Sequence, residues 1–178
     1  MASQLTESRE RSMNEQVVKA ARHYGYRGPI EPGMIHLIQE EGFRPTAYMD
    51  DVGVETVGVG ATAENMDANF FTETYPKYVD RAQRKVKSYH KLPEEAQLAV
   101  LSAVYRGDMG PKAAKLIDEG KFKAAAKEYL NHKEYKERKK EDPEDGVVLR
   151  MERNAEAIRS AGGESKSTAD SMAGGGLR

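Results

Sequence analysis

The chain has 178 residues and a mass of 19.8 kDa, a length typical of one domain with short extra segments. Charged residues make up 32% of the chain. Because there is no cysteine, disulfide frameworks, cysteine nucleophiles and cysteine-built metal sites are excluded. No stretch reaches the ~18 apolar residues of a membrane helix, and the net charge of −1 does not argue for nucleic acid binding.

The N-terminal part of the chain predicts two helices. The first covers residues 5–24, and its apolar stripe is thin, consisting of Val17, Val18 and Ala21. We therefore expect this helix to pack weakly or to serve a partner. The second covers residues 33–41, after Pro32 and before a glycine, which are typical start and stop signals.

Residues 46–60 alternate between apolar and small or polar side chains, which predicts two short strands joined by a turn at residues 50–53. From residue 62 to about residue 160 the pattern is mainly helical. We expect helices over residues 76–90, 94–106, 112–119, 121–135 and 147–160, with a charged loop over residues 136–146.

These elements predict an α+β fold, with a small antiparallel hairpin lobe, a mostly helical lobe and a cleft between them. The predicted organisation is a helical extension over residues 1–30, a central domain over residues 31–160 and a flexible tail over residues 161–178. The tail is rich in glycine, serine and alanine, a composition that does not favour a packed core.

Charge is distributed unevenly within the central domain. Residues 31–75 hold nine acids and one base, whereas residues 76–91 hold six bases and one acid. Solvated faces with salt bridges would explain this pattern. A carboxylate-lined site beside a basic wall for an anionic substrate would explain it equally well.

Two carboxylates in this acidic segment suit general acid–base chemistry. Glu41 ends a predicted helix beside apolar neighbours, and both features disfavour its charged form, whereas Asp50 lies in a solvated turn. Thr56 follows on the next strand and could hold a water molecule beside Asp50. An ordinary helix end followed by a turn aspartate would explain the same residues, and Glu40 and Asp51 are neighbouring alternatives for the two carboxylates.

Residues 41–60 follow the pattern EG-x-R-x3-Y-x-D-x2-G-x2-T-x-G-x-G. This segment resembles the active-site segment of phage-type lysozymes, which form glycoside hydrolase family 24. Weaker similarity to the family continues over residues 98–111, 122–130 and 146–153, so the resemblance covers about residues 33–160. It would make the central domain a lysozyme catalytic domain.

The resemblance implies a catalytic role for four residues. Glu41 would be the general acid, and Asp50 would be the base that places water or the carboxylate that stabilises an oxocarbenium ion. Thr56 would position that water, and Arg150 would pair with Glu41 and orient it. In the family's inverting mechanism the two carboxyl groups stand roughly 6.5–9.5 Å apart.

Three more positions, Tyr48, Gly60 and Arg106, are expected to bind or orient the substrate. Packing within the hairpin would also explain Tyr48. Gly60 and the neighbouring Gly58 would let the backbone approach the ligand closely. The sequence departs from the family pattern at Ala61, where the family usually has histidine, and at Arg106, where it has asparagine.

The function that the resemblance implies is that of an N-acetylmuramidase, which cleaves the β-1,4 bond between N-acetylmuramic acid and N-acetylglucosamine in peptidoglycan. It implies no cofactor or metal, and no nucleic acid or membrane partner. A lysozyme-like structural protein of the virion and a lytic transglycosylase are the alternatives.

The location of the protein is a separate expectation. The first twelve residues lack the apolar core of a signal peptide. This favours either the host cytoplasm, with holin-dependent release, or the phage virion. In the second case the N-terminal helix or the C-terminal tail would attach to a virion or tail component.

Overall fold

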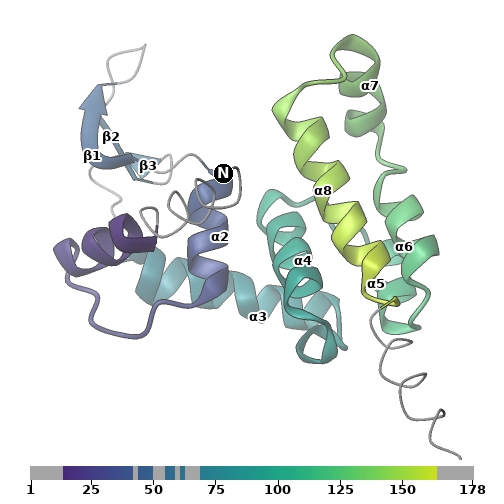
Figure 1. The fold of residues 1–178 in the computed structure, drawn as a ribbon, viewed down its shortest axis with the longest axis horizontal. Coiled ribbons are helices and arrows are strands. Elements are labelled where there is room, and N and C mark those ends of the chain that lie inside the picture. Colours follow the sequence, from purple (N-terminus) through teal and green to yellow (C-terminus); the bar gives the residue numbers. More distant parts are fainter. Residues whose placement is uncertain (1–13, 42–43, 50–54, 59–60, 63–68, 164–178) are drawn as a thin grey trace, which may run out of the picture. The chain divides into compact units, whose positions relative to one another are not determined.

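The computed structural model describes residues 14–41, 44–49, 55–58, 61–62 and 69–163, and in the strands it describes the backbone alone (Figure 1). The chain divides into two compact units, residues 1–77 (the N-terminal unit) and residues 78–178 (the C-terminal unit). The domain boundaries expected at residues 30 and 160 remain predictions.

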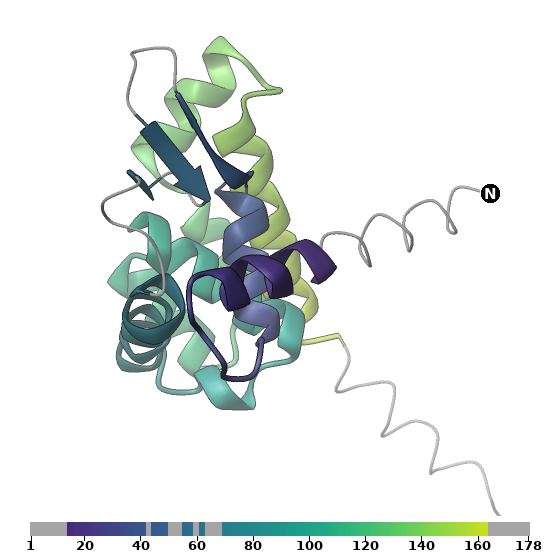
Figure 2. The same cartoon turned by 90° about the vertical axis from the view of Figure 1, so that its left-hand side faces the viewer.

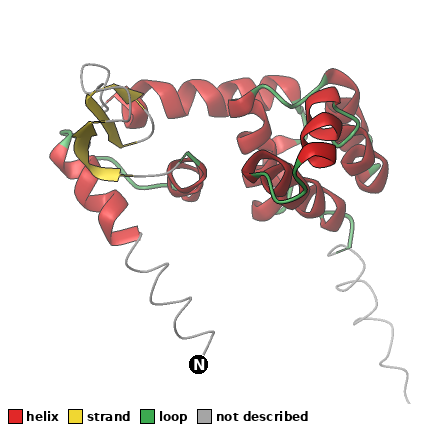
Figure 3. Ribbon diagram, turned by 90° about the horizontal axis from the view of Figure 1, so that it is seen from above, coloured by secondary structure: helices red, strands yellow, loops and turns green. Residues whose placement is uncertain are grey.

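The protein is mainly helical, and the predicted α+β class with a hairpin lobe is wrong. Figure 3 shows strands in one small patch and helices over most of the described chain. The strands are β1 (Arg44–Met49), β2 (Glu55–Gly58) and β3 (Ala61–Thr62), paired antiparallel in that order. With six, four and two residues they are too short to form a sheet layer with a core of its own.

Two helical segments form much of the N-terminal unit (Figure 2). Residues 14–23 are helical and bury Val17 and Ala21 completely, so this helix packs more firmly than its thin stripe predicted. Pro32 begins α2 (Pro32–Glu40), as expected for a proline in the first turn. The inner face of α2 is apolar and buried, with Met34, Leu37 and Ile38.

Aromatic side chains complete the core of this unit. The π-helix η2 (Phe70–Thr74) leads into α3 (Tyr75–Lys85) and buries Phe70 and Phe71. The Phe71 ring stacks on Tyr26 with 5.3 Å between ring centroids, a favourable aromatic geometry. The Tyr75 hydroxyl donates to Glu31 Oε2 at 2.7 Å.

The described part of the C-terminal unit contains the rest of α3 and the short 3-10 helix η3 (Tyr89–Lys91), followed by five helices. These are α4 (Glu94–Arg106), α5 (Pro111–Asp118), α6 (Phe122–Tyr129), α7 (Lys133–Glu141) and α8 (Gly146–Ser160). α8 packs against both α4 and α6, and α5 packs against α6. Side chains such as Leu101, Tyr129, Met151 and Ile158 fill the space between them.

One predicted loop in this unit is a helix. The charged segment expected to be a loop over residues 136–146 is helical to Glu141, and the helix expected over residues 121–135 ends at Tyr129. Pairs spaced four residues apart, including Arg138 with Glu134 and Lys133 with Glu137, stabilise α7 despite its high charge. No described helix is long and apolar enough to cross a membrane.

Candidate active site

Glu41, the predicted general acid, directly follows α2 and is its C-cap residue. Its backbone N–H donates to Leu37 O at 3.0 Å, which continues the helical pattern by one residue. Because Leu37 and Ile38 are buried on the same helix, the last turn has a fixed position within the N-terminal unit. The Glu41 side chain is half-buried, as is that of Glu40. A helix end of this kind suits a residue that must hold one orientation.

Two other predicted residues lie opposite each other on neighbouring strands. Tyr48 in β1 and Thr56 in β2 are register partners in the antiparallel pair, as are Met49 and Glu55. The strand pair therefore brings together two positions that the sequence singled out. The predicted base Asp50 and the predicted substrate-contacting Gly60 lie outside the described residues.

Arg150, the predicted partner of the acid, belongs to the C-terminal unit and lies near the start of α8. Asp145 caps this helix by accepting hydrogen bonds from the backbone N–H groups of Val147 at 2.8 Å and Val148 at 3.2 Å. The cap fixes where α8 begins, and Arg150 follows in the first turns. Although it is charged, its side chain is only 7% exposed.

A buried hydrogen-bond cluster surrounds this arginine. Arg150 Nε donates to Ser102 Oγ on α4 at 3.1 Å, and Asn154 Nδ2 donates to the same oxygen at 3.2 Å. Asn154 Nδ2 also donates to the Tyr129 hydroxyl on α6 at 3.3 Å. Burial raises the pKa of Tyr129 to about 12, so its hydroxyl stays neutral at ordinary pH. We call Ser102, Tyr129, Arg150 and Asn154 the polar core cluster.

Arg106, predicted to contact the substrate, is held by acids at the end of α4. Its Nε donates to Asp108 Oδ2 at 2.8 Å, and its Nη2 lies 3.5 Å from Glu134 Oε1. Burial of Arg106 opposes its charge, but the hydrogen bond and the charge of Asp108 raise the pKa of Arg106 above its ordinary value. The guanidinium is therefore a permanently charged group with a fixed position.

Ser102, Asn154 and Tyr129 were not among the residues that the sequence predicted for the site. Ser102 is fully buried in α4, and its signal in the sequence is a lone hydroxyl within the apolar run of residues 98–104. Asn154 lies four residues after Arg150 on α8, so the two side chains share a helix face. That spacing could have identified Asn154 as a neighbour of the arginine.

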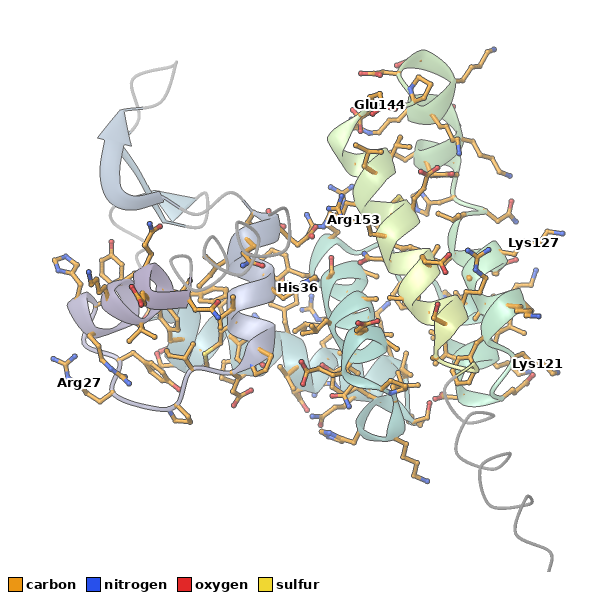
Figure 4. All side chains as sticks on the ribbon, in the orientation of Figure 1. Arg27, His36, Lys121, Lys127, Glu144 and Arg153 are labelled. Carbon is orange, nitrogen blue, oxygen red and sulfur yellow. The ribbon has the colours of Figure 1, made fainter. Side chains whose placement is uncertain are left out.

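A separate groove of about 350 Å³ lies among α6, α7 and α8, and none of the predicted site residues lines it. Lys139 on its wall donates to the Tyr135 hydroxyl at 3.0 Å and pairs with Glu152. Lys127, another wall residue, points away from α6 (Figure 4). Among the described residues no group of three histidine or acidic side chains could hold a metal ion.

Comparison with known families decides the class of the protein. The family model described as phage lysozyme matches residues 38–156, which is more than half of the chain. The chain belongs to the phage lysozyme family. It is thus a glycosidase-type enzyme of the peptidoglycan-degrading hydrolases, and peptidoglycan is its substrate. Neither a curated protein nor a solved structure matches it.

The match to the phage lysozyme family contains the positions of all seven predicted site residues: Glu41, Tyr48, Asp50, Thr56, Gly60, Arg106 and Arg150. It excludes residues 14–23, although this helix packs into the N-terminal unit, and it excludes residues 161–178. The comparison therefore gives no support for the predicted attachment of either end to a virion component.

Proposed function

We propose that this phage lysozyme is an N-acetylmuramidase that hydrolyses the β-1,4 bond between N-acetylmuramic acid and N-acetylglucosamine. In this proposal Glu41 protonates the glycosidic oxygen, and Asp50 activates a water molecule that Thr56 positions. Arg150 pairs with Glu41 and orients it. The observation that supports the proposal is the family match, because its range contains all four residues. Glu41, Asp50 and Thr56 also lie in the segment of residues 41–60 that resembles the family's active-site segment.

The reaction we propose proceeds with inversion and needs no cofactor. The acid donates its proton as the glycosidic bond breaks, and water attacks the opposite face of the sugar ring. The fixed end of α2 supports the choice of Glu41, since a general acid must stay within hydrogen-bond reach of the leaving oxygen. Tyr48, Gly60 and Arg106 are proposed to contact the glycan strand.

In the phage life cycle, we propose that the enzyme serves host lysis or cell-wall penetration. It would reach the wall from the host cytoplasm by holin-dependent release, or be delivered by the virion. Fractionation of infected cells and of purified particles, followed by immunoblotting, would distinguish the two routes.

The test of the reaction is a product assay on purified peptidoglycan with the parent and Glu41→Gln. We expect the parent to release fragments with free reducing ends, and Glu41→Gln to lose more than about 1,000-fold in rate, since the amide cannot donate the proton. Glu40→Gln is the matched control, and we expect it to remain active.

Three results would contradict the proposal in different ways. Fragments that end in a 1,6-anhydro ring, detected by mass spectrometry, would identify a lytic transglycosylase. No turnover by the folded parent would favour a lysozyme-like structural protein. Full activity of Glu41→Gln would exclude Glu41 as the acid. Circular dichroism of each variant would establish that the fold is retained.

A further inference from the structure

The polar core cluster is an exception within the C-terminal unit, whose interior is otherwise mainly apolar. Ser102 is fully buried, and Asn154 and Arg150 are 4% and 7% exposed. Placing such groups away from water is unfavourable unless each finds a partner, and it is most unfavourable for the charged guanidinium. An apolar contact between α4, α6 and α8 would hold the helices together without this cost.

The hydrogen bonds of the cluster form a connected chain across three helices. Ser102 Oγ accepts from both Arg150 Nε and Asn154 Nδ2, which occupies the two acceptor positions of a hydroxyl oxygen. The second hydrogen of Asn154 Nδ2 is directed to the Tyr129 hydroxyl. Arg150 Nε and Asn154 Nδ2 thus have defined acceptors, and the chain of hydrogen bonds joins Tyr129, Asn154, Ser102 and Arg150.

The bond to Ser102 constrains the guanidinium of Arg150. Rotation about the Cδ–Nε bond of arginine swings both the Nε–H and the guanidinium plane, so the hydrogen bond from Nε to Ser102 Oγ holds that plane in one orientation. Because Ser102 takes Nε, a carboxylate that pairs with Arg150 must do so through the Nη groups. Buried hydrogen bonds of this kind favour a single arrangement of the side chains that they join.

We propose that Ser102, supported by Asn154 and Tyr129, is a positioning residue that fixes the direction of the Arg150 guanidinium. The inference rests on the proposed function, in which Arg150 orients Glu41. Ser102 touches no substrate in this scheme and acts through Arg150. Its hydroxyl is required for the rate of the chemical step, and substrate affinity does not depend on it.

The first test replaces Ser102 by alanine, which removes the shared acceptor and leaves a good helix former in α4. We expect kcat on soluble peptidoglycan fragments to fall about tenfold, the factor that corresponds to the loss of one well-placed hydrogen bond, while KM changes less than about twofold. A residue that only supported the fold would not separate kcat from KM in this way once the variant is fully folded.

A second measurement follows the hydrogen bond itself. The side-chain Nε–H of Arg150 should give a ¹H–¹⁵N signal that exchanges slowly with water in the parent, because the group is buried and bonded. The signal is assigned by its loss in Arg150→Lys. We expect it to broaden or exchange rapidly in Ser102→Ala, whether or not the enzyme is active.

Two further variants separate positioning from stability. Ile158→Val on α8 removes one buried methyl group outside the cluster, and we expect lower stability with parental kcat. Ser102→Thr keeps the hydroxyl but adds a methyl group to a fully buried site. We expect it to lose stability while restoring kcat, measured well below its unfolding temperature.

The outcomes separate a failure of the proposed role of Ser102 from a failure of the proposed role of Arg150. Parental kcat in folded Ser102→Ala, together with a large loss in Arg150→Lys, would overturn the inference and leave the proposed function intact. Parental kcat in Arg150→Lys would instead refute the proposed role of Arg150, and the inference with it. Equal losses of kcat in Ser102→Thr and Ser102→Ala would show that packing, and not the hydroxyl, is what matters.

Discussion

The two units of the molecule are built around different kinds of core. In the N-terminal unit the described buried side chains are apolar or aromatic, and its polar contacts, such as Tyr75 with Glu31, lie where water has partial access. In the C-terminal unit, four polar or charged residues are buried among the apolar ones: Ser102, Asp108, Arg150 and Asn154. All the buried polar residues of the described chain are in this second unit.

The comparison shows what each kind of core can specify. Apolar packing around Leu37 and Ile38 fixes where the end of α2 lies, and any well-fitting apolar set would do the same. Hydrogen bonds between buried groups also specify direction, because each donor must meet its acceptor at a defined angle. In this enzyme, buried hydrogen bonds of this kind surround Arg150. We propose that the direction of its guanidinium matters for catalysis.

The largest predicted effects concern the apolar parts of both cores. Leu37→Ala in the N-terminal unit and Leu101→Ala in the C-terminal unit each remove a fully buried side chain. We expect each to lower the free energy of unfolding by about 2–5 kcal/mol, through lost burial and the cavity left behind. Urea unfolding followed by circular dichroism measures this, and a loss below about 1 kcal/mol at either site would contradict the assigned core.

The second prediction concerns the alkaline stability of the polar core. The pKa of Tyr129 is about 12 in the folded protein because of burial, above the ordinary value of 10.0. The unfolded chain therefore releases this proton first, and the stabilisation present below about pH 10 is lost as the pH rises towards 12. We expect a loss of roughly 2–3 kcal/mol over this range from Tyr129 alone.

Tyr129→Phe isolates this contribution. The variant loses the acceptor of one Asn154 hydrogen bond, so at pH 7 it should be less stable than the parent by about 1 kcal/mol. Its stability should then fall less steeply between about pH 10 and pH 12. Identical slopes in parent and variant would show that Tyr129 ionises as freely in the folded protein as in the unfolded chain.

The sequence predicted individual helices better than the fold class. α4 was predicted at its observed bounds because Pro93 precedes it and Gly107 follows it, the latter with a φ of 85° that favours glycine. α7 was missed because its nine residues are mostly charged and carry little apolar periodicity. The predicted fold class was wrong because the short alternating segment of residues 46–60 was taken to form a separate hairpin lobe. The described strands are few and short.

The site residues that the sequence could predict lie close together in one short segment. Glu41, Asp50 and Thr56 fall within sixteen residues and carry a recognisable spacing. The polar core cluster joins positions 48 residues apart in the case of Ser102 and Arg150, and 25 apart for Tyr129 and Asn154. The packing of α4, α6 and α8 determines which of these residues meet, and a local sequence pattern does not predict that packing.

The smallest predicted effect comes from a polar cluster outside the core of the C-terminal unit. Asp118, exposed at the end of α5, accepts hydrogen bonds from Ser88 N and Ser88 Oγ, both at 2.8 Å, and from Lys87 N at 3.1 Å. Partial burial opposes the charge of Asp118, but the bonds from Ser88 and Lys87 outweigh it and lower its pKa. This contribution to stability is present above the unfolded pKa of about 3.9, and it is lost as the pH falls through the lower folded value.

Because this carboxylate is exposed, we expect it to contribute less than about 1 kcal/mol, in contrast to the buried hydroxyl of Tyr129. Asp118→Asn should reduce the difference in unfolding free energy between pH 7 and pH 3 by that amount, as measured by urea titration at both pH values. The parent and Asp118→Asn share all other carboxylates. The test is therefore how much the loss of stability between pH 7 and pH 3 differs between them. Equal acid sensitivity in the parent and in Asp118→Asn would mean that water replaces the three hydrogen bonds to Asp118 at no cost in stability. Of these two polar clusters, only the buried one around Tyr129 would then contribute to stability.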